Sequence, residues 1–347
     1  MKDKPTHQEL QALASSGDLL IDFDYEREKV RPWVLKKKQT MLLADSHRRI
    51  AQKSKDFDSK AGKLCECGNY LDYRYFPETG DKKLAKANFC KYRLCPMCAW
   101  RRSLKIFGQA SQVLDEVKKQ KYEFIFVTLT QENCGHKELG QEITNIVHGL
   151  RLLMRRKAIK KVVHGWMRII EITHNVDPLS KSYDTFHPHV HMIWAVKRSY
   201  FKEGYVSQAE LVNLWQKCMK LEYKPITDIR RVRTKGKGHI REVAKYSVKP
   251  GEMLTDDWDL TDRAVYTLDE SLHNRRLLAW GGIIKEVRKT FKFDDPESGD
   301  LVNTDSDKVE NPELQYILIR YRWNVGYQQY LKSKESVWDP SKNTLQL

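Results

Sequence analysis

Hydrophobic and polar positions along the chain predict strands alternating with helices between about residues 110 and 255. Apolar or alternating runs at Tyr122–Thr130, Trp166–Thr173 and His189–Val196 are typical of strands in a partly buried sheet. Residues 137–156 place apolar side chains at helical spacing, and Ser207–Leu221 predicts another helix whose first residue suits an N-cap. This order indicates an α/β or α+β core built on a four- or five-stranded sheet.

The flanking segments suggest three further regions. Residues 1–60 are polar and basic, with a helical pattern from Trp33 onward. Two strand-like runs around the turn PETGD predict a β-hairpin, and a last strand is expected at Leu314–Trp323. We therefore expect a basic N-terminal region (1–60), a Cys-rich module (61–105), the main domain (110–255) and a C-terminal region (256–347) with an acidic loop at 294–310.

Composition points to a soluble protein with a polyanionic partner. Among 347 residues, 62 Lys and Arg stand against 46 Asp and Glu, a net charge of +16. Such an excess favours nucleic acid over a membrane surface. The N-terminus shows no apolar signal region, and no apolar run approaches about 20 residues, so we expect a cytoplasmic protein without a membrane partner.

Three histidines, His187, His189 and His191, occur at every second position before an apolar run. Alternate residues of a strand share one face, so these imidazoles point the same way. Glu171 lies inside another strand-like run, where an unpaired carboxylate would be costly to bury. Two imidazoles and one carboxylate leave coordination positions open, as a catalytic divalent ion requires. We expect His189, His191 and Glu171 to bind Mn²⁺ or Mg²⁺; the other interpretation is an edge strand without metal.

His187 precedes Pro188 at the expected strand entrance, where it could instead lie in a loop. It remains an alternative third ligand.

The segment REVAKYSVK contains Glu242, Tyr246 and Lys249 at spacings that would share one helical face, with Pro250 ending the helix. A phenol is a weak nucleophile at neutral pH, but a nearby lysine or metal-bound phosphate lowers the cost of forming the phenolate. Glu242 could serve as a general base for the phenol or for a water. An ordinary surface helix is the alternative.

A basic run precedes this segment and could follow a phosphate backbone, or be a solvated loop. Its candidate DNA contacts are Arg230, Arg231, Arg233, Lys235 and Lys237.

Cys90, Cys95 and Cys98 have the spacing C-x4-C-x2-C. Either Cys65 or Cys67 can complete four thiolates across the hairpin, as in a zinc ribbon, and Cys67 is preferred. Four thiolates leave no open position, so the zinc is expected to be structural. Arg101 and Arg102 follow at once and could face DNA.

Together these motifs resemble the replication initiator (Rep) proteins of bacterial rolling-circle plasmids, of the single-Tyr type within the HUH endonuclease superfamily. HVH at 189–191 matches the His-hydrophobic-His motif, and YSVK at 246–249 matches Tyr-x-x-Lys, with Glu242 one turn earlier. FVTLT at 126–130, RPW near residue 31, FCKYRLCPMCAWRR and the GG pair at 281–282 are also similar. The likeness covers about residues 30 to 290 and implies an α+β, HUH-like fold with a mainly antiparallel central sheet flanked by helices.

The resemblance implies site-specific nicking and joining of DNA at a plasmid double-strand origin, single-stranded at the nick. Tyr246 would attack the phosphate held at the metal, leaving a free 3′-OH and a 5′-phosphotyrosine link, and Glu242 would activate water at termination. A host helicase and DNA polymerase are the expected partners. Alternatives are a non-catalytic, zinc-stabilised DNA-binding regulator, or an HUH relaxase or transposase.

Overall fold

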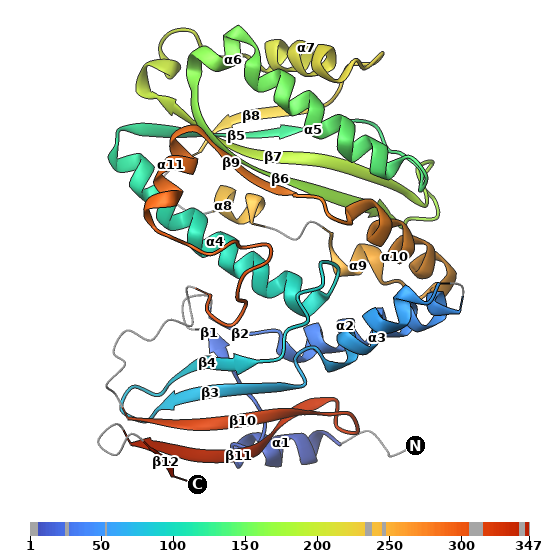
Figure 1. Cartoon of the computed structure of the whole chain (residues 1–347), viewed down its shortest axis with the longest axis vertical. Coiled ribbons are helices and arrows are strands. Elements are labelled where there is room, and N and C mark those ends of the chain that lie inside the picture. The colour runs from blue at the N-terminus through green and yellow to red at the C-terminus, as the bar shows by residue number, and fades with distance from the viewer. Residues whose placement is uncertain are drawn as a thin grey trace. The chain divides into compact units, whose positions relative to one another are not determined.

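A computed structural model of the chain describes residues 6–24, 28–52, 54–232, 238–244, 248–304, 315–339 and 344–346 (Figure 1). The chain forms two compact units, one of residues 1–105 and 300–347 and the other of residues 106–299. Helix α4 (Pro96–Lys119) contributes to both. Each unit has its own antiparallel sheet, which confirms the α+β class. None of the helices in these described ranges has the length and apolarity needed to cross a bilayer.

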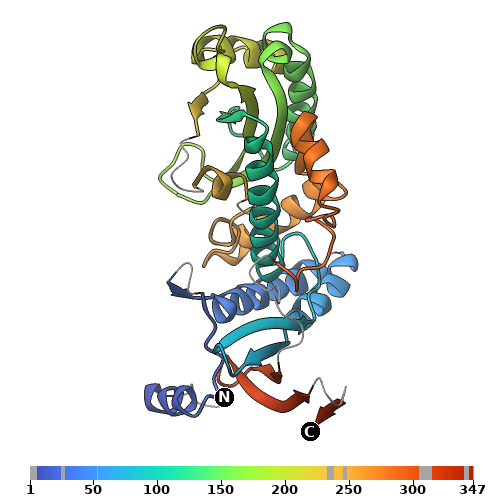
Figure 2. The ribbon, with the colours of Figure 1, turned by 90° about the vertical axis from the view of Figure 1, so that its left-hand side faces the viewer.

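The sheet of the first unit joins the expected hairpin to strands from the end of the chain. Its order is β12-β11-β10-β3-β4. The strands are β3 (Tyr70–Phe76), β4 (Asp81–Ala87), β10 (Tyr316–Asn324), β11 (Gln329–Asp339) and β12 (Thr344–Gln346). Arg320 on β10 donates hydrogen bonds of 2.7 Å to both carboxylate oxygens of Asp72 on β3, and this bidentate pair helps to fix their register. Figure 2 shows the two hairpins, β3–β4 in light blue and β10–β11 in red.

Helices and a short strand pair from the N-terminal segment complete this unit. They are α1 (His7–Ser15), β1 (Phe23–Asp24), β2 (Lys29–Val30), α2 (Trp33–Ala51) and α3 (Asp56–Glu66). The basic helix expected from residue 33 is α2, but Lys36 and Lys37 on it are buried. The indole N–H of Trp33 and the hydroxyl of Tyr73 both donate to the Asp22 carboxylate, at 2.7 and 2.8 Å.

This grouping differs from the four consecutive regions expected from the sequence. The ranges 1–60 and 61–105 fall in one unit, and the range 256–347 is divided at residue 300. The reason is the β3–β10 pairing, which connects segments more than 200 residues apart and leaves no local signal in the sequence.

The second unit carries a five-stranded sheet of order β8-β5-β7-β6-β9. The strands are β5 (Tyr122–Leu129), β6 (Val163–Asn175), β7 (Thr185–Lys197), β8 (Thr227–Arg231) and β9 (Leu278–Gly281). The three strands expected from the apolar runs are β5, β6 and β7. Because β7 begins at Thr185, His187 and Pro188 lie within the strand and not in a loop.

Helices cover both faces of this sheet. They are α5 (Leu139–Arg155), α6 (Lys157–Val162), the 3-10 helix η1 (Arg198–Phe201), α7 (Gln208–Met219), α8 (Gly238–Val243), α9 (Pro250–Met253), α10 (Trp258–Leu272) and α11 (Gly282–Thr290). Figure 1 shows α5, α6 and α7 on one side of the sheet and α4 and α8 on the other. The expected N-cap is present, because Ser207 Oγ accepts a hydrogen bond from the backbone N–H of Glu210.

Strand alternation separates the two faces of the sheet. Met167 and Ile169 of β6, with Ile193 and Ala195 of β7, belong to the core that also contains residues of α4, α8 and α11. Continuing along the same face by steps of two leads from these apolar residues to Glu171, His191 and His189. The candidate ligands therefore lie where this core gives way to polar side chains.

The GG pair at 281–282 has a local reason. A Cβ on Gly281 would overlap the indole of Trp166, and one on Gly282 would overlap the carbonyl oxygen of His164. Gly282 also has a φ of +54°, which favours glycine. The two glycines allow β9 and the start of α11 to lie close against β6.

Candidate metal centres

Strands β6 and β7 bring the expected histidine and carboxylate ligands together. Glu171 pairs directly with His189 across the strands, and His191 follows two residues on, so the three side chains share one face. Glu171 Oε2 lies 3.1 Å from Nε2 of His191 and 3.3 Å from Nε2 of His189. We call these three residues the Glu171 cluster; one donor atom from each lies within 4.8 Å of the others.

Hydrogen bonds at the far nitrogens leave Nε2 of these rings for a ligand role. Nδ1 of His189 is 3.1 Å from the carbonyl oxygen of His187, which can only accept, so Nδ1 carries a proton. Nδ1 of His191 is 3.2 Å from Oγ1 of Thr128, which can donate or accept. A neutral His189 therefore presents an electron pair at Nε2, as a metal ligand must.

The carboxylate of Glu171 is buried and charged. Its side chain is only 3% exposed, and burial acts to raise its pKa, but hydrogen bonds and charge from His189 and His191 outweigh burial and hold the pKa well below its usual range. The Lys249 ammonium lies 3.3 Å from the other oxygen, Oε1, and also donates to Glu252. This donor set fits a hard or borderline divalent ion, which would take the place of the imidazole contacts at Oε2.

His187 lies on the same face of β7 but outside the group of converging donors. Its ring centroid is 5.4 Å from that of His189. Burial, and to a smaller extent the charge of His189, lowers the pKa of His187. Glu171 is therefore the better placed third ligand.

The prediction of a single helix that carries Glu242, Tyr246 and Lys249 is wrong. Helix α8 ends at Val243, and Pro250 begins α9. Lys249 has extended angles (φ −81°, ψ 131°), because a following proline disfavours the helical region. Tyr246 lies outside the described residues. Two residues after it, Val248 forms a parallel bridge with Ile172, the neighbour of Glu171.

The first unit contains a group of four cysteines, which we call the four-cysteine cluster. Its members are Cys67, Cys90, Cys95 and Cys98. Their Sγ atoms approach within 3.5 to 3.7 Å in three pairs. A tetrahedral zinc with Zn–S bonds of about 2.3 Å places its sulfurs about 3.8 Å apart, so the donors fit zinc. Backbone N–H groups of Cys90 and Lys91 also donate to sulfurs of this cluster, as expected for thiolates.

Cys65 is not part of this cluster, since its Sγ accepts a hydrogen bond of 2.8 Å from Arg48. A neighbouring residue that the sequence did not single out is Lys37, which is fully buried. Its ammonium donates to the carbonyl oxygens of Cys65 and Cys67 and to Oδ1 of Asn69, at 2.6 to 2.8 Å. Lys37 thus holds the chain that presents Cys67, although in the sequence it is one of three consecutive lysines.

The expected DNA contacts divide into three groups. Arg101 is buried and donates to the carbonyl oxygens of Leu301 and Val302, so its guanidinium has a structural role and our expectation of a DNA contact is corrected. Arg102 is half-buried and donates to the carbonyl of Lys91. Of the other expected contacts, Arg230 and Arg231 are exposed on β8. Arg233, Lys235 and Lys237 lie outside the described residues.

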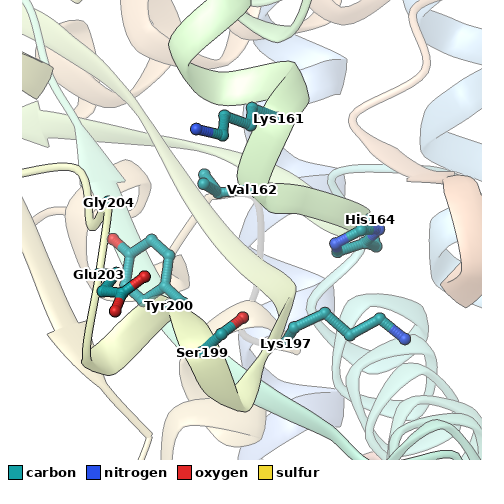
Figure 3. Close-up of a pocket in the computed structure, with 8 residues that line it drawn as sticks. All are labelled: Lys161, Val162, His164, Lys197, Ser199, Tyr200, Glu203 and Gly204. Carbon is teal, nitrogen blue, oxygen red and sulfur yellow. The ribbon is translucent and has the colours of Figure 1, made fainter.

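A pocket of about 260 Å³ lies where β6 begins and β7 ends, at the open end of this hairpin (Figure 3). Figure 3 shows His164 and Lys197 on one side of it and Tyr200 and Glu203 on the other. The remaining lining residues are Lys161, Val162, Ser199 and Gly204. Its charged lining residues are two lysines and one glutamate.

Comparisons with known proteins agree with the motifs. Residues 81–331 match the model of a family described as Replication protein. The chain is 37% identical over 328 residues to Protein rep of Bacillus amyloliquefaciens, covering 87% of this chain and 94% of that protein. It is 36% identical over 320 residues to Protein rep of Streptococcus pneumoniae serotype 2, covering 90% and 95%. No solved structure matches the chain significantly. The resemblance to replication proteins is confirmed.

Proposed function

The chain belongs to the Replication protein family, and from this premise we propose that it initiates rolling-circle plasmid replication by nicking one DNA strand at the double-strand origin. The observation that carries the proposal is the Glu171 cluster, an open set of two imidazoles and one carboxylate. Supporting evidence comes from Val248, two residues after Tyr246 in the sequence, which pairs with Ile172 beside Glu171.

His189, His191 and Glu171 would hold Mn²⁺ or Mg²⁺, which supplies Lewis-acid polarisation of the scissile phosphate. The β6–β7 ladder would hold these three ligands in place, and three protein ligands would leave positions open for phosphate oxygens. Lys249 was expected to assist the phenolate. Since its ammonium is bound by Glu171 and Glu252, we assign it instead the positioning of the Glu171 carboxylate.

In the proposed reaction the phenol oxygen of Tyr246 attacks the phosphorus. A Tyr–O–P bond forms and the bond to the 3′ oxygen breaks, which leaves a 5′-phosphotyrosine and a free 3′-OH. The phenol proton passes to a base, for which Glu242 is the candidate, and the departing oxygen takes a proton from solvent. At termination Glu242 would activate a water to hydrolyse the phosphotyrosine link.

DNA binding is supported by the net charge of +16 and by exposed basic residues on the second unit. Arg230 and Arg231 extend from β8, and Lys161 and Lys197 line the pocket in Figure 3. Such contacts to phosphate would make origin binding weaken steeply with salt. Host helicase and polymerase remain proposed partners.

The test uses the full-length protein, Mn²⁺ or Mg²⁺ and a supercoiled plasmid carrying its origin. Nicked circles and a nucleotide adduct on Tyr246, mapped by mass spectrometry, are expected with the wild type. Tyr246→Phe should abolish both, whereas the control Tyr205→Phe, at an exposed tyrosine, should retain both. Tight origin binding by the wild type without nick or adduct would leave only a DNA-binding regulator.

A further inference from the structure

A second group of histidines and a carboxylate lies on the opposite face of the β6–β7 hairpin. We call His136, His174 and Asp184 the Asp184 cluster; their donor atoms also lie within 4.8 Å of one another. Asp184 Oδ1 is 3.0 Å from Nε2 of His136 and 2.9 Å from Nε2 of His174. His174 is three residues beyond Glu171 on β6, so it points to the other side of the sheet, where its ring stacks on Phe186.

The Asp184 cluster repeats the hydrogen-bond pattern of the Glu171 cluster. In each, one carboxylate oxygen faces two Nε2 atoms, and a cationic side chain holds the other oxygen. Arg263 does so here, through Nε and Nη2 at 3.3 and 3.0 Å from Asp184 Oδ2. In each cluster one histidine has Nδ1 against a backbone carbonyl and the other has Nδ1 against a threonine hydroxyl. Here the carbonyl is that of Glu252 (3.0 Å) and the hydroxyl that of Thr267 (2.7 Å).

The bonds of His174 require a cation or an extra proton. Its Nδ1 must donate to the carbonyl oxygen of Glu252, so in a neutral ring Nε2 carries only an electron pair. That electron pair would face the Asp184 oxygen at 2.9 Å, which also only accepts while ionised. The side chain of His174 is 1% exposed, so a water cannot readily relieve this contact. Either the ring is an imidazolium or a metal ion belongs between the two groups.

We propose that the Asp184 cluster is a second divalent-metal site, separate from the nicking site and independent of the proposed function. Two imidazole nitrogens and one carboxylate oxygen suit a borderline transition ion such as Zn²⁺. His136 and Asp184 are 27% and 19% exposed, which leaves a side open for a water ligand and for entry. Arg263 orients the carboxylate from outside, as the hydrogen-bonding partners of metal ligands commonly do.

An ion at this position would connect three segments. His136 precedes α5, His174 is the penultimate residue of β6, and Asp184 lies just before β7. The carbonyl that orients His174 belongs to Glu252. The Glu252 carboxylate accepts a hydrogen bond from Lys249, which also contacts Glu171. The site would therefore stabilise the sheet end next to the nicking site.

The experiment measures metal content and visible absorption, with no need for nicking activity. The protein is the full chain with zinc in the four-cysteine cluster and with His189→Ala and His191→Ala, which disable the Glu171 cluster. After dialysis against Zn²⁺, adding His136→Ala should lower bound zinc by about one equivalent, since it removes one of only three protein ligands. The matched control His148→Ala, at an exposed histidine of α5, should change nothing.

Titration of the same double variant with Co²⁺ gives a second, spectroscopic readout. Ligand-field absorption typical of nitrogen and oxygen donors should appear and should be absent with His136→Ala. Equal zinc content with and without His136, and only thiolate-type Co²⁺ absorption, would overturn the proposal and leave His174 as a buried imidazolium.

Discussion

The four-cysteine cluster and the Glu171 cluster use opposite designs for binding a cation. Cys67, Cys95 and Cys98 are at most 1% exposed, and four thiolates saturate a tetrahedral ion. The Glu171 cluster offers three donors on the face of a sheet, and its histidines are 11 and 13% exposed. The difference indicates that an ion at the four-cysteine cluster would be structural, whereas an ion at the Glu171 cluster would keep positions open to a substrate.

The supporting lysines differ in the same way. Lys37 is wholly buried and bonds to backbone carbonyls, so it supports the fold around the four-cysteine cluster. Lys249 is 43% exposed at its side chain and bonds to the ligand Glu171 itself. Burial acts to lower the pKa of Lys249, but the carboxylates of Glu252 and Glu171 outweigh burial and raise it, so the side chain stays a cation.

The largest effect should come from breaking the closed site. Cys95→Ser removes a zinc ligand, and structural zinc in small domains contributes about 10 kcal/mol or more, comparable with the whole stability of a domain. The first unit should lose zinc and its cooperative unfolding transition, measured by metal analysis and circular dichroism. Cys65→Ser is the matched control and should keep both, because Cys65 lies outside the cluster. Retained zinc in Cys95→Ser would contradict the assignment.

Breaking the open site should abolish activity and spare the fold. His191→Ala should reduce origin nicking by about 1,000-fold, since metal polarisation of a phosphate is worth several kcal/mol. The thermal unfolding midpoint should stay near that of the wild type, and zinc in the four-cysteine cluster should be unchanged. A variant that unfolds like Cys95→Ser would show that the Glu171 cluster is structural.

Lys37→Met tests the buried support of the closed site. Three acceptors lose their donor, so the free energy of unfolding should fall by about 2–4 kcal/mol in urea titrations. Lys38→Met, at the exposed neighbouring position, should change it by less than about 0.5 kcal/mol. Equal effects at the two positions would mean that the buried hydrogen bonds contribute nothing.

Lys249→Met should have the smallest effect. Loss of an outer partner of a metal ligand usually weakens binding by about 10–100-fold, so nicking should need more Mn²⁺ and recover when it is supplied. The control Lys224→Met, at an exposed position away from the cluster, should show the wild-type Mn²⁺ dependence. Failure of excess Mn²⁺ to rescue would place Lys249 in the chemical step.

Local spacing made much of the two sites predictable. The C-x4-C-x2-C run and the alternating histidines each lie in a short segment, where chain geometry alone brings the side chains together. The strands β5, β6 and β7 were predictable for the same reason, since buried strands are continuous apolar runs. The helix expected across residues 242–249 was wrong, since α8 ends at Val243 and the following Pro250 disfavours a helical conformation at Lys249.

The sequence by itself determined the kinds of donor, the family and the fold class of this protein. Only the tertiary structure decided that Cys67 and not Cys65 joins the thiolates, that Arg101 is buried, and that the C-terminal strands complete the first sheet. The Asp184 cluster is the clearest case, because three separate segments contribute its members. Contacts between distant segments depend on strand register and packing, which one-dimensional spacing does not encode.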